Sequence, residues 1–286
     1  MTYRRAIGVL AAHLGCEATE AAVHARRLAT QPDRYAESLL RATNTELLLV
    51  DTGFPAPGAG TDWRELGALA GCPSHPVLRI EQVAEASGGD VGQTVAGARA
   101  AGFVALKTIA AYRGGLDLEA LAPPVREPLL AALDANEATG DPLPLQVHTG
   151  FGDSDLLLPR ARPGYLKPLI ERFERTTFVL LHCYPFVREA GWLASVYGNV
   201  FLDLSLTIPH VARPAVALAE ALELAPVSKL LYASDAALTP ELYLLAALWW
   251  RDALAAVLPD LLPAGAAEEA ARMILRDNAR SLYRLG

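Results

Sequence analysis

The chain has 286 residues, of which 52% are hydrophobic and 20% are charged, a balance typical of a folded globular protein and not of a disordered one. The formal net charge is −7 at pH 7 and no run of basic residues occurs, which argues against nucleic acid or an anionic membrane surface as the main partner. The length permits two domains, but a single α/β barrel of this size is ordinary.

The N-terminal segment looks only superficially like a signal peptide. Arg4 and Arg5 precede an apolar run, but His13 interrupts that run and no A-x-A cleavage site follows. The three cysteines include no C-x-x-C pair, which fits a reducing compartment. The most apolar stretch, residues 242–250, is too short to cross a bilayer. We therefore expect a cytoplasmic protein with no membrane partner.

The chain opens with a helical pattern from residue 3 to about residue 41 and then alternates between strand-like and helical segments. Seven apolar runs bounded by turn residues are typical of buried strands. Their centres lie near residues 48, 78, 105, 146, 180, 202 and 232. Helical patterns cover residues 63–70, 91–101, 128–136, 165–173, 214–224, 240–257 and 266–285.

This alternation favours an α/β fold, either a (β/α)8 TIM-type barrel or a doubly wound sheet. No G-x-G-x-x-G motif follows the first strand, which weakens the dinucleotide-binding alternative. A barrel needs eight strands, and the helical opening indicates that the absent strand is the first. We therefore predict one domain, residues 1–286, that is a barrel lacking its first strand, with residues 1–44 as the helical segment before the second. Its two unpaired edges, near residues 48 and 232, favour aggregation or a homo-oligomer.

Two of the predicted strands end on a histidine, His148 and His182, and a third ends on Asp235. Because a helix separates the first two strands, they should be parallel, with their carboxyl ends side by side. Either histidine by itself is equally well explained as a core residue bonded to neighbouring backbone. Together, two imidazoles and a carboxylate at strand ends are typical of a divalent metal site.

Other charged residues also stand at or just beyond predicted strand ends. Lys107 ends its strand as the histidines do, and Arg113 follows it shortly after. The lysine side chain can extend to solvent, pair with Asp51 or Asp235, or act at the site. Asp203 ends the sixth strand in a similar position.

Four phrases resemble the amidohydrolase superfamily, specifically its amidohydrolase-related group (amidohydrolase family 2). They are L-K-T-I-A-A-Y-R-G-G-L at 106–116, V-H-T-G-F-G-D at 147–153, H-C-Y-P-F at 182–186 and Y-A-S-D at 232–235. The chain is most similar to the hydrolase-like half that some proteins carry ahead of a glutamine-synthetase domain. The resemblance implies a metal-dependent hydrolase barrel that binds one or two divalent metals, commonly zinc.

The resemblance also implies roles for single residues. His148 matches the strand-five metal ligand, His182 the strand-six histidine, and Asp235 the strand-eight aspartate that binds metal and takes a proton from the attacking water. Lys107 matches a strand-four lysine that is carboxylated and bridges the metals in two-metal members. Such enzymes carry an H-x-H pair on strand one, and this sequence has no H-x-H. The strand that should hold the pair is the one that the pattern lacks.

We therefore expect an enzyme that hydrolyses a C–N bond of amide type in a small polar substrate, with zinc as the expected metal. Asp235 would act as general base, and His182 would orient the water or polarise the carbonyl. Lys107 or Arg113 would hold a substrate carboxylate. Two alternatives stay open: a non-oxidative decarboxylase on the same scaffold, and a metal-free barrel without catalysis, since the H-x-H pair is missing.

Overall fold

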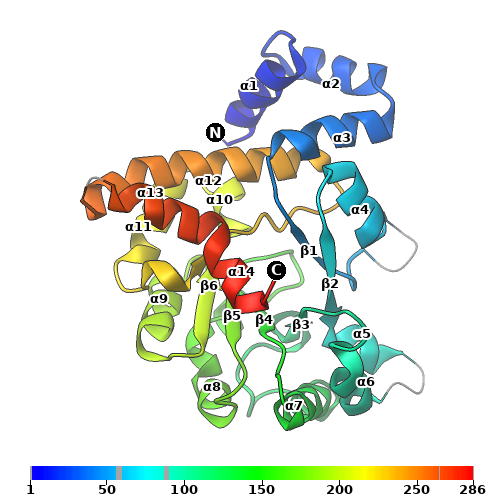
Figure 1. Ribbon diagram of the computed structural model, residues 1–286, viewed down its shortest axis with the longest axis vertical. Coiled ribbons are helices and arrows are strands. Elements are labelled where there is room, and N and C mark those ends of the chain that lie inside the picture. The colour runs from blue at the N-terminus through cyan, green and yellow to red at the C-terminus, as the bar shows by residue number, and fades with distance from the viewer. Residues whose placement is uncertain (1, 56–59, 87–89, 264, 286) are drawn as a thin grey trace.

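The computed structural model describes residues 2–55, 60–86, 90–263 and 265–285. Within these residues the strands form one parallel sheet whose spatial order is the order of the chain (Figure 1). The strands are β1 (Leu48–Asp51), β2 (Ser74–Arg79), β3 (Ala105–Thr108), β4 (Leu145–Thr149), β5 (Phe178–His182), β6 (Val200–Asp203) and β7 (Leu230–Leu231). All seven lie where the sequence predicts strands, so the α/β barrel with one strand missing is confirmed.

The middle of the sheet is the most regular part. All five residues of β5 are buried, because β4 and β6 pair with it on either side. Residues at alternate positions divide between two apolar clusters. Phe178 and Leu180 belong to the large cluster shared with the helices, and Val179 and Leu181 belong to the small cluster inside the barrel. This two-sided burial explains why the strand reads as a continuous apolar run.

The helical opening, expected as one pattern, is three helices in the structure: α1 (Thr2–Leu14), α2 (Glu20–Ala29) and α3 (Pro32–Ala42). The breaks have local causes. Thr19 caps α2 by accepting a hydrogen bond from the Ala22 N–H, and Pro32 stands in the first turn of α3, where its missing N–H costs nothing.

The remaining helices follow the strands in alternation. They are α4 (Trp63–Ala70), α5 (Ile80–Glu85), α6 (Val91–Ala98), α7 (Pro123–Ala138), α8 (Lys167–Arg172), α9 (Val187–Val196), α10 (Thr207–His210), α11 (Pro214–Leu222), α12 (Pro240–Leu261), α13 (Ala266–Arg272) and α14 (Asn278–Tyr283). By length and composition α12 could cross a membrane. In the structure it is a core helix that packs against α3 and α11, with Trp249 and Trp250 buried.

The two ends of the sheet do not meet. Among the described residues β1 pairs only with β2, and β7 pairs only with β6. The last strand, which the sequence predicts near residue 232, already ends at Leu231, because the Tyr232 N–H bonds to the Ile274 carbonyl and not to a strand (2.9 Å). A cavity of about 1910 Å³ is lined by residues of both edges and extends to the carboxyl ends of the strands.

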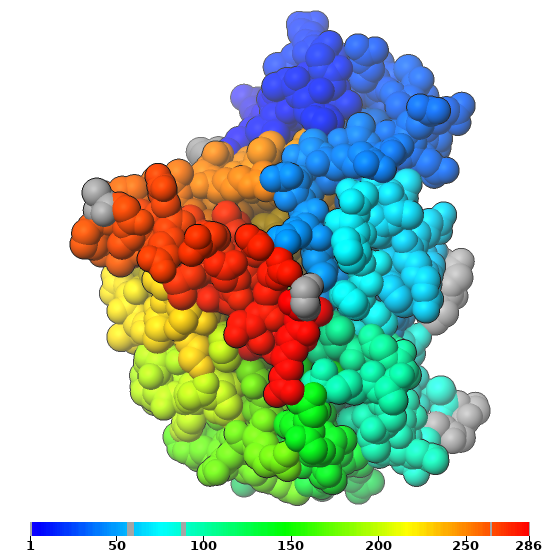
Figure 2. All heavy atoms as spheres, viewed as in Figure 1, coloured from blue at the N-terminus to red at the C-terminus, as the bar shows by residue number. Residues whose placement is uncertain are grey.

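The C-terminal segment crosses the region between the two edges. Figure 2 shows it, in red, beside the blue and cyan residues of the β1–β2 side. Glu46, just before β1, pairs with Arg276 (2.7 Å) and Arg280 (2.6 Å). Tyr283 enters the inner cluster and accepts a hydrogen bond from the Gln146 side chain (3.0 Å). α14 therefore places Tyr283 in the barrel interior, against β4.

Candidate active site

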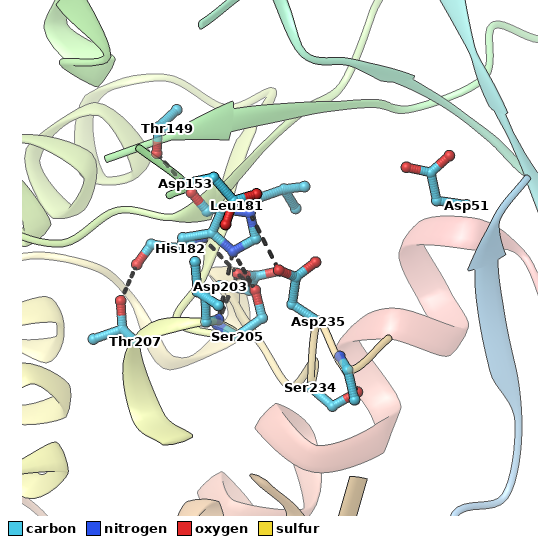
Figure 3. A network of polar contacts seen from close by, with 12 residues as sticks. Asp51, Thr149, Asp153, Leu181, His182, Asp203, Ser205, Thr207, Ser234 and Asp235 are labelled. Carbon is cyan, nitrogen blue, oxygen red and sulfur yellow. Dashed lines mark hydrogen bonds and ion pairs between the residues drawn. The ribbon is translucent and has the colours of Figure 1, made fainter. Parts of the chain in front are cut away.

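The ends of β4 and β5 bring two imidazoles together. The ring centroids of His148 and His182 lie 4.5 Å apart, and both side chains are buried. The Asp235 carboxylate, beyond β7, places Oδ2 3.9 Å from His182 Nε2 (Figure 3). The three side chains line the same cavity. The structure thus brings the three predicted residues together, while their catalytic and metal-binding roles remain predictions.

The orientation of His182 depends on an unusual backbone conformation. The register pairs Thr149 with His182, so pleating alone would point the His182 ring away from His148, which is paired with Leu181. His182 instead has φ +66°, in the left-handed region, and its ring turns toward His148. A side chain in this conformation carries strain that the surroundings must hold in place.

Three hydrogen bonds hold His182 (Figure 3). Its backbone N–H donates to Asp203 Oδ1 (2.9 Å), and its carbonyl accepts from the Thr207 hydroxyl (2.6 Å). Its ring nitrogen Nδ1 lies 2.7 Å from Ser205 Oγ, which itself lies 2.8 Å from Asp203 Oδ1. These residues, Asp203, Ser205 and Thr207, form the β6 clamp.

The clamp selects one tautomer of His182. The Ser205 hydroxyl donates its only proton to Asp203, so its oxygen accepts from Nδ1–H of the ring. The Leu206 N–H, 3.4 Å from the same nitrogen, makes a longer and weaker contact than Ser205. Nε2 therefore keeps its lone pair on the side of Asp235, which is the form of imidazole that binds metals.

Burial dominates the electrostatics of this wall. It lowers the pKa of His182 well below the ordinary value and, with repulsion from the neighbouring His182 and Lys107, lowers the pKa of His148 to about 2. Both imidazoles are therefore neutral near pH 7. Burial also raises the pKa of Asp203 to about 6, although hydrogen bonds from the His182 N–H and Ser205 oppose this shift.

The donor chemistry fits a divalent metal, but the spacing is wide. His148 Nε2 is buried without a hydrogen-bond partner, and His182 Nε2 faces a carboxylate. Two ligands of one zinc ion lie roughly 3.3 Å apart, because bonds of about 2.0–2.1 Å meet at the tetrahedral angle. The 3.9 Å between His182 and Asp235 exceeds this value. In the part of the chain that the structure describes, no group of three or more His, Cys, Asp or Glu side chains is close enough to hold a metal as it stands.

The loops that follow the two histidines are packed together. The Phe151 N–H donates to the Tyr184 carbonyl (2.7 Å). Gly150 has φ +74°, and a Cβ at that position would lie 2.3 Å from the same carbonyl oxygen. A Cβ on Gly152 would lie 1.8 Å from the Tyr112 hydroxyl and 3.1 Å from His148 Nε2. Glycine at position 150 therefore permits the contact between the loops, and glycine at position 152 permits the close approach of Tyr112.

A second charged group lies at the ends of β1, β2 and β3. Lys107 Nζ is 3.2 Å from Asp51 Oδ2, and Arg79 contacts the same carboxylate through Nε (3.1 Å) and Nη2. The ion pair with Asp51 is one of the alternatives that the sequence leaves open for Lys107. Ligation of a metal by Lys107, as predicted, would require that contact to open. Burial disfavours the charged form of Asp51, but Lys107 and Arg79 outweigh it and hold the pKa below its ordinary value.

The other predicted substrate-binding residue, Arg113, lies farther out. It lines the cavity but pairs with Glu85 (3.1 Å), and its side chain is 40% exposed. Arg79 and the clamp residue Ser205 have no predicted site role. A signal for Arg79 was present in the sequence, because it stands near the end of an apolar run as Lys107 does. In the structure the sheet register pairs Arg79 with Lys107.

Comparisons with known proteins agree with the fold. The profile of the family described as Amidohydrolase matches residues 93–285. Protein fluG of Emericella nidulans is 43% identical over 164 residues, which are 54% of this chain and 19% of that protein. This chain therefore spans only a small part of that relative's length.

Two solved structures are similar to the chain. One is a Lactobacillus casei ATCC 334 protein provisionally assigned as a metal-dependent hydrolase, with a TM-score of 0.87 and 29% identity over 99% of this chain and 84% of that one. The other is dihydroorotase of Campylobacter jejuni, with a TM-score of 0.52 and 17% identity over 89% and 79% of the two chains. The second likeness concerns the fold alone.

Proposed function

We propose, from the premise that this chain belongs to the amidohydrolase family, that it is a metal-dependent hydrolase cleaving a C–N bond of amide type in a small polar substrate. One observation carries the proposal: two neutral, buried imidazoles and a carboxylate line one cavity at the carboxyl ends of parallel strands. The similarity to a protein assigned as a metal-dependent hydrolase supports it.

In this proposal His148, His182 and Asp235 hold one divalent metal, for which zinc is the expected ion. When bound, the metal supplies Lewis-acid polarisation of the scissile carbonyl and makes water a stronger acid. The Asp235 carboxylate takes the proton of the attacking water at Oδ2 and then delivers it to the leaving amine. His182 orients that water beside Asp235, because the β6 clamp fixes its ring.

The test begins with the metal content of the purified chain. We expect up to one equivalent of metal, and release of ammonia or amine from small amides once zinc is added. Asp235→Asn and His148→Ala should abolish turnover, and His148→Ala should also weaken zinc binding. His210→Ala is the matched control, because that histidine is exposed, bonds to the Leu206 carbonyl (2.8 Å) and lies outside the cavity.

The product separates hydrolysis from decarboxylation, the other chemistry that the scaffold suggests. Release of carbon dioxide without amine would replace the proposed reaction. Metal below roughly a tenth of an equivalent, with no gain on adding zinc, would reject the enzyme and favour the metal-free barrel. The absence of H-x-H and the wide donor spacing among the described residues are the observations that favour this second candidate.

A further inference from the structure

The cavity has two chemically different walls. His148, His182 and Asp235 form one wall, and Arg79 and Lys107, with Asp51 between them, form the other. Figure 3 shows Asp51 set apart from the group around His182. A substrate bound in this cavity is therefore exposed to two kinds of chemistry.

On the second wall two cations contact one carboxylate. The side chains of Arg79 (13% exposed) and Lys107 (10% exposed) share the carboxylate of Asp51. The nearby Glu81 is an additional acid, whose Oε1 accepts hydrogen bonds from the Thr108 hydroxyl and the Ile109 N–H (2.9 Å). Burial raises the pKa of Glu81. A buried cation with donors left over is stabilised by a bound anion.

The donors of this wall are not used up. Asp51 engages Nε and Nη2 of Arg79 and one contact of Lys107 Nζ. No contact occupies Nη1 of Arg79 in the described residues, and an ammonium carries three N–H groups. A guanidinium with a free edge beside an ammonium matches a planar carboxylate, which accepts two parallel hydrogen bonds.

We propose that Arg79 and Lys107 bind a carboxylate of the substrate, so that the enzyme acts on amides that carry a separate carboxylate, such as the monoamides of short dicarboxylic acids. The hydrolysis of the amide in this inference rests on the proposed function, whereas the binding of the carboxylate does not. Arg79 is its central residue, because Arg113 pairs with Glu85 nearer the surface.

Calorimetry on the full chain tests the binding without turnover. The probes are succinamate and glutaramate, each compared with the neutral diamide of the same length, succinamide and glutaramide. The two members of a pair differ only by a carboxylate in place of a carboxamide. In metal-free protein, we expect at least one carboxylate to bind about tenfold or more tightly than its diamide. Equal binding of both members in both pairs, or no detectable binding, overturns the proposal.

Variants assign the preference to a residue. Arg79→Gln should reduce the preference for the carboxylate over the diamide to about twofold or less. Arg79→Lys keeps the positive charge but lacks the two parallel N–H donors of the guanidinium, and should retain part of the preference. Arg113→Gln is the matched control and should keep the full preference. An Arg79→Gln protein that is folded by circular dichroism and still prefers the carboxylate would reject the role of Arg79. The wild-type comparison stands even if that variant does not fold.

Turnover then separates the two proposals. A carboxylate preference in binding with no amide hydrolysis would reject the hydrolase and leave the anion site. Hydrolysis of diamides and monoamides at equal kcat/KM would reject the anion site and leave the hydrolase.

Discussion

His182 and Asp235 lie side by side at one wall of the cavity in the same left-handed backbone conformation, with φ of +66° and +51°, yet they are supported very differently. His182 ends a strand that has neighbours on both sides, and its side chain is 1% exposed. Asp235 follows a two-residue edge strand, its side chain is 32% exposed, and no hydrogen bond within the described residues holds its carboxylate. The flanking strands, and not the local sequence, determine how firmly each residue is held.

The same contrast explains the incomplete metal geometry. The β6 clamp fixes His182 because β6 lies directly beside β5. β7 has no such neighbour on its outer side among the described residues, so the position of Asp235 depends on its own loop. The distance that is too wide for a shared metal is the one between the firmly held His182 and the weakly held Asp235.

The largest expected effect compares a leucine in the middle of the sheet with one at its edge. Leu180 on β5 is buried between Val147 and Leu202, whereas Leu49 on β1 is half-buried. Leu180→Ala should lower the free energy of unfolding by about 3 kcal/mol, and Leu49→Ala by about 1 kcal/mol, because only the first leaves an enclosed cavity. Urea unfolding of both variants measures the difference. Equal losses would show that the edge is as well packed as the centre.

Removal of the Ser205 hydroxyl should affect the metal more than the fold. Ser205→Ala frees the His182 ring to change tautomer, and we expect zinc affinity to fall by about 10- to 100-fold while stability falls by about 1 kcal/mol. Competition with a chromogenic chelator measures the zinc affinity. Ser195→Ala, on α9 outside the cavity, loses only a 2.7 Å hydrogen bond to the Trp192 carbonyl and is the control. If both variants bind zinc with the same affinity, the hydrogen bonds from His182 through Ser205 to Asp203 have no role in metal binding.

Acid should weaken the β1–β3 wall through Asp51. Its pKa is lower in the folded protein than in the unfolded chain, so its contribution to stability is complete above the unfolded pKa of about 3.9 and is lost as the pH falls through the folded value. The stability difference between wild type and Asp51→Asn should therefore be large at pH 7 and should narrow below about pH 4. Chemical unfolding at several pH values measures it. A constant difference would mean that Asp51 titrates alike in both states.

The smallest effect concerns the open edges of the sheet. Unpaired strand edges favour weak self-association, so the apparent mass should rise with protein concentration. Val50→Lys on β1 should reduce the rise, whereas Leu224→Lys, an exposed apolar residue outside the strands, should not. Sedimentation velocity over a wide concentration range measures this. A monomer at every concentration would contradict the expected homo-oligomer.

The sequence alone was sufficient for the strands and for which strand ends meet. Apolar runs separated by helices specify parallel neighbours, so His148, His182 and Asp235 could be assigned to one mouth. The inward turn of His182 could not be predicted, since alternation along β5 points its ring to the helix side. The role of Ser205 was hidden for a similar reason: β6 ends at Asp203, and the chain then turns back toward His182.

The contact between the loops after β4 and β5 has a consequence for turnover. Because the Gly150 backbone lies against Tyr184, neither histidine-bearing loop can shift without displacing the other. The rim at β4 and β5 is therefore expected to be rigid. Any opening that admits substrate and releases product should occur at the rim formed by β7 and β1, so the rate of product release should depend on the segment that carries Asp235.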